Sequence, residues 1–589
     1  MAENRINILN DDIIGKIAAG EVVERPASAV KELVENSIDA QADSIEIEIQ
    51  AAGQSLIRIA DNGVGMSGED ARIASKRHAT SKINGIEDLD SIVTLGFRGE
   101  ALSSIAAVSQ MDIITCPRSE TSGIYLYMEG GEILKVRPVG RSHGTTIEVR
   151  NLFYNVPARR KFLKKEASEL AEIINVIGRF VVAYPGIEFK LSHSDRVLFH
   201  APKEMKLIER IRLILGPDVA NHMVRIPESE SDDICKIDGF VSIPSNTRKD
   251  RRSQMFFVNR RFVRNRLLSD SIYDAYRSLL ERGRFPGAVL FISISPGEVD
   301  VNVHPMKLEV KFSDERTIRD AVKKAVQSAF ENIKKTGDAI NTVQGSLVQD
   351  TGFIEEEKPV LLGISETQEE FAYEFNRTQD KPVGSGAKLQ VSIDKEQPEL
   401  SFSGQMHQVG GCYIVQIKED TITIIDQHAA HERILYEFFS RGIETGAVEV
   451  QNLLFPVRMD LSAAEAVIMD KITSNFRILG FHIELFGDKS FIVQAAPAVL
   501  KDRDLKTVVY DVLASLTDYD KTRIEKIDEL IKVTSCRAAI KAGDVLSNEE
   551  MIALIRQLNK CSLPFTCPHG RPTVQDITID DLEKMFRRK

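Results

Sequence analysis

Residues 28–40 read SAVKELVENSIDA, and this segment decides the fold because its apolar and polar side chains separate at helical spacing. The polar face carries Glu32, Asn36 and Asp39, so a carboxylate and an amide lie one helical turn apart. Glu32 is suited to act as general base on a water, and the Asn36 oxygen can complete the oxygen shell of a phosphate-bound Mg²⁺. An ordinary solvated helix face is the alternative interpretation. The apolar stripe consists of Val30, Leu33, Val34 and Ile38.

A predicted strand and a glycine turn follow this helix. The apolar run at residues 56–60 ends at Asp61, and Asn62, Gly63 and Gly65 come directly after it. An aspartate in that place can accept a hydrogen bond from an adenine amino group, and the glycines let the backbone approach a ligand. A plain hairpin turn explains the same pattern equally well.

A second glycine-rich segment, GFRGEAL at residues 96–102, opens another predicted helix. Free backbone N–H groups at the start of a helix form a cradle for phosphate. The segment therefore predicts a phosphate loop. Its candidate contacts are Gly96, Phe97, Arg98 and Gly99.

These segments and GTT at residues 144–146 resemble, in order and spacing, the GHKL ATPase superfamily of gyrase B, histidine kinases, ninety-kilodalton heat-shock chaperones and MutL. Within the superfamily, three motif sequences resemble the MutL branch most: IAAGEVVERP at residues 17–26, RHATSKI at 77–83, and the phosphate loop. The resemblance implies a GHKL (Bergerat-type) α/β sandwich that binds ATP and Mg²⁺. These MutL-like motif sequences disfavour a chaperone or a topoisomerase of the superfamily.

The resemblance also implies the role of each nucleotide-site residue. Glu32 would be the general base, Asn36 the Mg²⁺ ligand and Asp61 the adenine reader, with Gly65 beside the nucleotide. Thr146 would support the base through a water, and Thr80 would belong to a lid over the nucleotide. Residues 300–307, DVNVHPMK, match the family element that sends a lysine, here Lys307, to the γ-phosphate as a point charge.

The chain divides into several regions. At 589 residues it exceeds the roughly 250–300 residues that one hydrophobic core serves, so two or three domains are expected. Mixed α/β patterns run to about Phe330, periodicity then fades, and order resumes at Gly410. With the resemblance, this predicts an ATPase domain at 1–215 and an α/β transducer domain at 216–333. A flexible linker is expected at 334–403, and an α+β dimerisation and endonuclease domain at 404–589. Within the last, we expect an inner subdomain (404–454 and 532–589) and an outer one (455–531).

Composition and charge limit the kind of protein. Apolar residues make up 43% and charged residues 28%, which favours a globular protein over a disordered or membrane-embedded one. Six cysteines are too few for a disulfide scaffold in a chain of this length, so grouped cysteines are better candidates for metal ligands. The N-terminus lacks a signal-peptide pattern. We therefore expect a cytoplasmic, nucleoid-associated protein.

Two basic stretches stand out from a net charge of −11, against which any grip on DNA must work. Snorkelling side chains on a solvated surface are the alternative interpretation. The MutL resemblance favours DNA, since the family binds double- and single-stranded DNA without reading its sequence, through phosphate contacts. The candidates are Arg159, Arg160, Lys161, Arg260, Arg261, Arg264 and Arg266.

Residues 426–437, DQHAAHERILYE, carry a candidate metal site. His428 and Glu432 are one helical turn apart and can ligate one Zn²⁺ or Mn²⁺, with Asp426 as a further oxygen donor. Cys567 and His569 form a second compact donor pair far downstream. An ordinary polar helix start is the alternative interpretation of the first segment.

These segments resemble the endonuclease motifs of MutL proteins: Asp-Gln-His-Ala, two residues, Glu, four residues, Glu. Residues 535–544 resemble a companion motif, with Ser535 where relatives often have alanine, and a final Phe-x-Arg element fits residues 586–588. The resemblance implies catalytic roles for Asp426 and Glu432. Whether Cys536 ligates the metal or only packs beside it is left open.

The resemblance implies a homodimer in which ATP couples mismatch recognition by MutS to metal-dependent nicking of the newly made strand. The alternative is a non-nucleolytic matchmaker that recruits other enzymes; family members with that role lack the Asp-Gln-His-Ala segment. Residues 451–456, QNLLFP, resemble the sliding-clamp-binding segment of nuclease-bearing relatives, with Gln451, Leu454 and Pro456 as contacts. A core-facing strand is the alternative for this segment.

Overall fold

The computed structural model describes residues 22–76, 78–82, 94–96, 99–227, 235–276, 279–280, 283–300, 309–335, 405–418, 420–446, 448–487, 489–501, 503–518, 527–541 and 543–588. Phe97, Arg98 and Lys307 lie outside these residues, and so does most of the predicted linker, residues 336–403. Within the described part of the chain, no helix has both the length and the apolarity that a membrane span requires.

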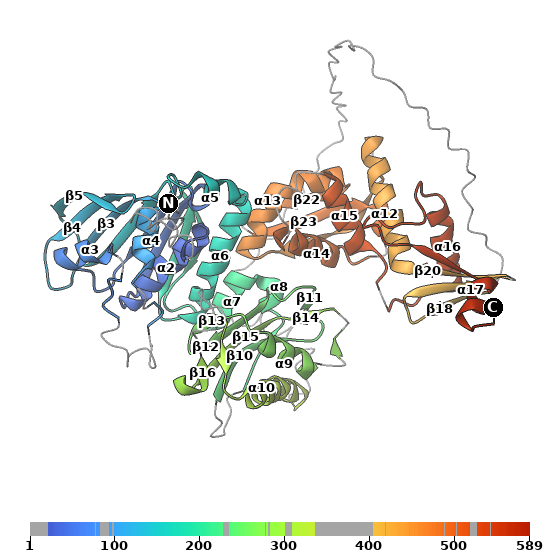
Figure 1. The fold of residues 1–589 in the computed structure, drawn as a ribbon, viewed down its shortest axis with the longest axis horizontal. Helices are drawn as coiled ribbons and strands as arrows, with labels where there is room; N and C mark the ends of the chain where they lie inside the picture. Colours follow the sequence, from blue (N-terminus) through green and yellow to red (C-terminus); the bar gives the residue numbers. More distant parts are fainter. Residues whose placement is uncertain are drawn as a thin grey trace, which may run out of the picture. The chain divides into compact units, whose positions relative to one another are not determined.

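An eight-stranded sheet forms the first domain (Figure 1). Residues 45, 47 and 49 are isoleucines buried on one face of β1, because successive side chains of a strand point to opposite faces of the sheet. The strands pair antiparallel except β1 and β7, which are parallel. In sheet order they are β5 (Glu132–Val139), β4 (Gly123–Glu129), β3 (Gln110–Cys116), β6 (Gly144–Arg150), β2 (Leu56–Asp61), β1 (Ser44–Gln50), β7 (Glu188–His193) and β8 (Arg196–Ala201).

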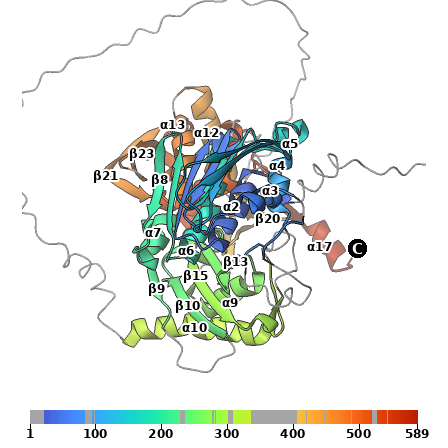
Figure 2. The same cartoon turned by 90° about the vertical axis from the view of Figure 1, so that its left-hand side faces the viewer.

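Helices α2 and α4 pack on this sheet and lie on the same side of it in Figure 2, and a third helix, α6, packs on α2. The predicted helix is confirmed as α2 (Pro26–Asp39), which begins at a proline because the first turn needs no N–H donor there. Of its apolar stripe, Val30, Leu33 and Val34 are buried and Ile38 is partly buried, and each buried valine or leucine contributes about 1.5–3 kcal/mol. The polar face of α2 therefore remains available to a ligand. The other two helices are α4 (Ala101–Ala107) and α6 (Glu166–Ala183).

A five-stranded sheet forms the second domain. A two-residue turn, Asn259-Arg260, joins two of its strands with φ of 48° and 67°, the left-handed conformation that tight hairpins require. Helices α9 (Arg266–Tyr276) and α10 (Glu315–Lys335) belong to the same domain. In sheet order the strands are β13 (Arg261–Val263), β12 (Gln254–Val258), β15 (Ala288–Ile294), β10 (Cys235–Ser242) and β9 (Met223–Arg225).

The C-terminal region contains two sheets. Strands β19 and β20 pair antiparallel, from Tyr413 opposite Asp426 to Ile417 opposite Ile422. The four-stranded sheet runs β18 (Gln405–Val409), β19 (Tyr413–Ile417), β20 (Thr421–Asp426), β24 (Val574–Thr578), with helices α12 (Gln427–Glu444), α15 (Ile527–Ala538), α16 (Asn548–Asn559) and α17 (Ile579–Met585). The three-stranded sheet runs β21 (Val450–Asp460), β23 (Ser490–Pro497), β22 (His482–Leu485), with α13 (Ala463–Ile478) and α14 (Leu505–Asp518).

Short elements complete the described parts. They are α3 (Gly68–Ala74), α5 (Pro157–Phe162), α7 (Leu207–Leu215), α8 (Pro217–Ala220), β11 (Thr247–Arg248), β14 (Phe285–Pro286), β16 (Val299–Asp300), β17 (Lys311–Phe312) and three short 3₁₀ turns, Ala51–Gly53, Pro296–Glu298 and Ala498–Leu500. Together the described parts confirm a multidomain α/β protein.

Candidate nucleotide and metal sites

The polar face of α2 holds a compact cluster of charges. The Lys31 ammonium lies 2.9 Å from Glu32 Oε1 and 3.0 Å from Glu35 Oε1. Burial opposes the charge of Lys31, but the two carboxylates outweigh it and raise the lysine pKa above its usual value. The lysine therefore remains charged near neutral pH.

One turn further along α2, side-chain oxygens of Asn36 and Asp39 accept hydrogen bonds from Lys82 and from the backbone of residues 95 and 96. Lys82 Nζ lies 2.9 Å from Asn36 Oδ1 and 2.5 Å from Asp39 Oδ2. Asp39 also accepts the backbone N–H groups of Leu95, at 3.0 Å, and Gly96, at 3.2 Å. The start of the phosphate loop thus lies against the helix that carries Glu32 and Asn36, as the sequence interpretation requires.

Asp61 lies at the end of β2 with both carboxylate oxygens engaged. Oδ1 accepts the N–H groups of Gly63 (2.9 Å) and Thr145 (3.2 Å), and Oδ2 accepts the Ser37 hydroxyl (2.9 Å). Burial raises the pKa of this carboxyl, although the three hydrogen bonds oppose the shift. Sequence reasoning missed Ser37 and Thr145, because only the pairing of β2 with β6 brings residue 145 beside Asp61. Thr146 is buried in the same strand.

Two glycines allow backbone segments to approach at this site. Gly65 has φ of 71°, and a side chain there would lie 2.0 Å from the Cys116 carbonyl oxygen. Gly99 has φ of 62°, and a side chain there would lie 2.6 Å from the carbonyl oxygen of Ala79. No other residue fits either position, so the segment containing Thr80 lies directly beside the phosphate loop.

The seven basic candidates have different surroundings. On α5, Arg160 and Lys161 are exposed, Arg159 is half-buried, and Phe162 is 87% exposed. In the second domain Arg260, Arg264 and Arg266 are exposed. Arg261 instead donates to backbone carbonyls of the ATPase domain.

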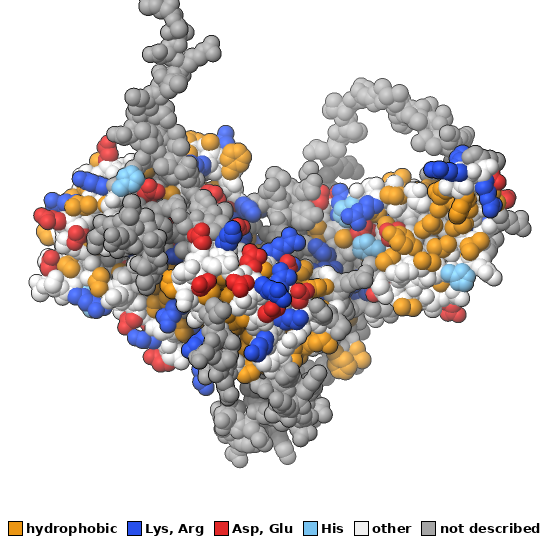
Figure 3. Space-filling model, turned by 60° about the horizontal axis from the view of Figure 1, so that its bottom comes forward, with side chains coloured by type: hydrophobic (Ala, Val, Ile, Leu, Met, Phe, Trp, Pro, Cys, Tyr) orange, Lys and Arg blue, Asp and Glu red, His pale blue; other side chains and the backbone are white. Residues whose placement is uncertain are grey.

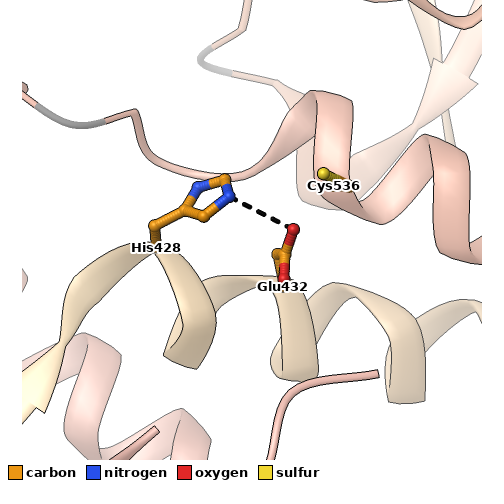
Figure 4. A group of neighbouring side chains, drawn as sticks. All are labelled: His428, Glu432 and Cys536. Atoms are coloured by element: carbon orange, nitrogen blue, oxygen red, sulfur yellow. Dashed lines mark ion pairs between the residues drawn. The ribbon is translucent and has the colours of Figure 1, made fainter. Parts of the chain in front are cut away.

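In the C-terminal region, α12 and α15 bring His428, Glu432 and Cys536 together (Figure 4). His428 Nε2 lies 3.2 Å from Glu432 Oε1, and His569 Nδ1 lies 3.5 Å from Glu432 Oε2. The donor atoms form two triads that share Glu432, the second with Cys567 and His569, and within each triad all atoms lie within 4.8 Å of one another. Four of the five ligands predicted from both ends of the domain thus meet, and Cys536 joins them, whereas Asp426 belongs to neither triad.

The charges in this cluster are tightly coupled. Hydrogen bonds with Cys536 and Glu432 raise the pKa of His428 to about 10. Burial opposes ionisation of Glu432, but His428 and Cys536 lower its pKa to about 2. The carboxylate is therefore an anion surrounded by nitrogen and sulfur donors.

The backbone of Ile540 holds two histidines of α12 in place. The Ile540 carbonyl lies 2.7 Å from His428 Nδ1, which leaves Nε2 facing the cluster. The Ile540 N–H donates to His431 Nδ1 at 3.0 Å. Burial, with Arg503 nearby, lowers the pKa of His431 to about 3, so this ring is neutral and able to accept. No local pattern in the sequence indicates this backbone partner of His431, which is 109 residues away.

Two other carboxylates of the motif support the backbone. Asp426 Oδ1 caps α12 by accepting the N–H groups of His428 (2.9 Å) and Ala429 (3.0 Å). Glu437 accepts the N–H groups of Ser562 (2.7 Å) and Leu563 (3.1 Å), and so ties α12 to the chain that leads to Cys567. The sequence interpretation gave Glu437 no role.

The segment 451–456 lies on the surface. The pairing of β21 with β23 is interrupted between Asn452 and Val457. Leu454 is 88% and Phe455 80% exposed. The core-facing alternative for this segment is therefore wrong.

Three family profiles match the chain. Residues 24–130 match a histidine kinase-, DNA gyrase B- and HSP90-like ATPase, and residues 211–331 match the C-terminal domain of DNA mismatch repair proteins. Residues 406–546 match the MutL C-terminal dimerisation domain. Each of the three folded regions is thus matched separately.

Curated relatives match over the whole chain. DNA mismatch repair protein MutL of Pelodictyon phaeoclathratiforme is 38% identical, over 99% of this chain and 100% of the relative. MutL of Bacillus anthracis is 38% identical, over 99% of both chains. Among solved structures, the ADP complex of the Aquifex aeolicus MutL ATPase domain is 28% identical, with a TM-score of 0.36, and covers 51% of this chain and 98% of its own. An N-terminal domain of a DNA repair protein is 26% identical, with a TM-score of 0.47, and covers 55% of this chain and 99% of its own.

The ATPase profile covers residues 24–130, which include α2 and its polar side chains. The match to a dimerisation domain implies a homodimer. With identity sustained from end to end, the chain belongs to the MutL family of DNA mismatch repair proteins.

Proposed function

We propose that this protein is an ATP-driven homodimer that nicks the error-containing DNA strand, at a metal site in its C-terminal domain, after MutS has recognised a mismatch. The observation that carries the nuclease proposal is the convergence of four donor side chains, from residues 428 to 569, on the carboxylate of Glu432. A domain that served only for dimerisation has no need of such a cluster.

The donor set fits a transition metal. Imidazole, thiolate and carboxylate are the ligands of Zn²⁺, and imidazole with carboxylate also accepts Mn²⁺. His428, Glu432, Cys536, Cys567 and His569 would hold the ion, and a metal would displace the proton that His428 holds. Bound there, the ion would polarise a phosphate and lower the pKa of a water. We assign Asp426 to helix capping, with its second oxygen free to orient a ligand.

In the first domain, we assign Glu32 as general base on the attacking water and Asn36 as Mg²⁺ ligand. Asp61 accepts from the adenine amino group, because its ring of donors fixes the carboxylate in one orientation. Gly65, Thr80, Gly96, Phe97, Arg98, Gly99, Thr146 and Lys307 complete the proposed nucleotide site.

For the dimer, we propose the outer face of the four-stranded sheet. The inner face, with Ile414 and Ile425, is buried. The outer face carries Val409, Tyr413 and Ile417, each about half exposed, and apolar side chains gather on the C-terminal part of the face in Figure 3. An apolar sheet face of this kind is typical of an interface between subunits.

DNA and a clamp would bring the substrate to the metal site. Arg159, Arg160, Lys161, Arg260, Arg264 and Arg266 would bind phosphates of double- or single-stranded DNA without reading sequence. Gln451, Leu454 and Pro456 would dock on the replication sliding clamp as an exposed peptide. With DNA as substrate, we expect the protein to work at the nucleoid in the cytoplasm.

The test is nicking of supercoiled plasmid with Mn²⁺ by the full chain and by Glu432→Lys. We expect the variant to lose nicking while ATPase activity and dimerisation persist, because a cation replaces the shared ligand. Glu444→Lys is the matched control: the same substitution on an exposed site of the same helix. If Glu432→Lys nicks at the wild-type rate, the nuclease proposal fails and the matchmaker takes its place.

A further inference from the structure

Arg261 links the second domain to the ATPase site. Its Nη2 donates to the backbone carbonyls of Thr94 and Leu95, each at 3.1 Å. The N–H groups of Leu95 and Gly96 donate to Asp39 on the other side. The segment 94–96 is therefore held between α2, which carries the nucleotide-site residues, and an arginine of the neighbouring domain.

Arg261 stands on a rigid support. It follows the Asn259-Arg260 turn, and the Asn259 side chain donates to the Ile294 carbonyl (2.9 Å) and accepts the Ile294 N–H (3.0 Å). The next residue, Phe262, lies beneath the Arg179 guanidinium, 4.2 Å from ring centroid to charge. These contacts fix the hairpin to β15 and to α6, so movement of the second domain is transmitted to the guanidinium.

The surroundings of Arg261 are enclosed and carry charge. Lys31, Glu35 and Arg261 line one small cavity together with Arg179, whose pKa burial lowers to about 10. The other terminal nitrogen of Arg261, Nη1, is buried and lacks a hydrogen-bond partner among the described residues. A guanidinium stays charged in such a place, so its bonds to the two carbonyls are charge-assisted.

The backbone at Gly96, next to the residues that Arg261 holds, lies close to side chains of the proposed nucleotide site. A side chain on Gly96 would lie 3.2 Å from Lys82 Nζ and 4.0 Å from Asn36 Oδ1, so its backbone lies near the Asn36 oxygen that would hold Mg²⁺. A displacement of this backbone by ~1 Å would move a bound phosphate away from the attacking water, and misplacement of that size lowers rates by up to about 10²-fold.

We propose that Arg261 is a positioning residue for ATP hydrolysis, which makes the geometry of the phosphate loop depend on the seating of the second domain. The inference rests on the ATPase alone and is independent of the nuclease proposal. It also removes Arg261 from the DNA-binding set, because its guanidinium is engaged within the protein.

The experiment compares full-length Arg261→Met and Arg261→Lys with the wild type. We expect kcat for ATP hydrolysis to fall about tenfold in Arg261→Met with a smaller change in KM, and Arg261→Lys to recover part of the loss, since one ammonium cannot reproduce the planar donor. Amide hydrogen exchange at Leu95 and Gly96 should accelerate in Arg261→Met, a readout that a general loss of stability would not confine to these residues. Arg319→Met, an exposed arginine on α10, is the matched control.

Unchanged kcat and unchanged exchange at residues 95–96 in Arg261→Met would overturn the proposal. A loss of DNA affinity with normal ATPase activity would overturn it in favour of the phosphate-contact role. Failure of plasmid nicking in the wild type would leave the ATPase measurements unaffected, so the two proposals fail separately.

Discussion

The two candidate sites of this protein are built in opposite ways. The described part of the nucleotide site draws on residues 32–146, and largely on backbone: Asp61 is fixed by two N–H groups, Asp39 accepts two more, and glycines allow the loops to approach one another. The metal site draws on side chains from residues 428–569 that converge on Glu432. In the nucleotide site, the second domain holds residues 94 and 95 through Arg261. The metal-site donors all come from the C-terminal domain. Changes at a distance should therefore affect the first more than the second.

The largest effect confined to the nucleotide site is expected from Glu32→Ala. We expect ATP hydrolysis to fall by about 10²–10⁴-fold, the usual contribution of a general base, while ATP binding persists because Asp61 and the phosphate loop are untouched. Steady-state turnover and nucleotide affinity measure this. Exposed Glu204→Ala serves as control. Near-normal turnover would remove Glu32 from the role.

Metal removal tests the other half of the comparison. Chelation should abolish plasmid nicking and lower the melting temperature of the C-terminal domain, since bound metal stabilises only the folded site. ATP turnover assayed with Mg²⁺ restored should remain. Cys567→Ser should bind less Zn²⁺ per chain, whereas Cys561→Ser, a half-buried cysteine outside both triads, should bind the wild-type amount. Equal zinc in both variants would exclude Cys567 as a ligand.

His431→Phe probes the support beneath the metal site. The ring would still fill the buried space, but the Ile540 N–H would lose its acceptor, and the Ile540 carbonyl that orients His428 would shift. Loss of such supporting bonds usually lowers metal affinity by about 10–100-fold. Zinc competition titration measures the change, with exposed His482→Phe as control. An unaltered affinity would mean that His428 is oriented without His431.

The smallest effect on the protein itself is expected from Leu454→Ala. Because this side chain is 88% exposed, the free energy of unfolding should change by less than about 0.5 kcal/mol, and basal nicking should be unchanged. Clamp-stimulated nicking should be lost. Leu485→Ala, another exposed leucine of the same sheet, is the control. Stimulation that survives Leu454→Ala would remove the segment from clamp binding.

Much of the local structure was predictable from pattern. The helix at α2, the strands β1 and β2 and the hairpin β19–β20 follow from periodicities of 3.6 and 2, which depend only on neighbours in sequence. Exposure of residues 454–456 was not predictable, because an apolar run is equally consistent with a buried strand, and only the interrupted pairing of β21 decides it.

The sequence by itself determined which chemistry is available: Glu32 and Asn36 one turn apart, Asp61 at a strand end, and His428 and Glu432 one turn apart, since helical and strand geometry set these distances locally. Only the tertiary structure decided which groups meet. Cys536 joins Glu432 because α15 packs on α12, Thr145 reaches Asp61 because β6 pairs with β2, and Arg261 leaves the basic surface for the backbone of residues 94 and 95. Such contacts depend on how distant elements pack, and no spacing within a segment records that packing.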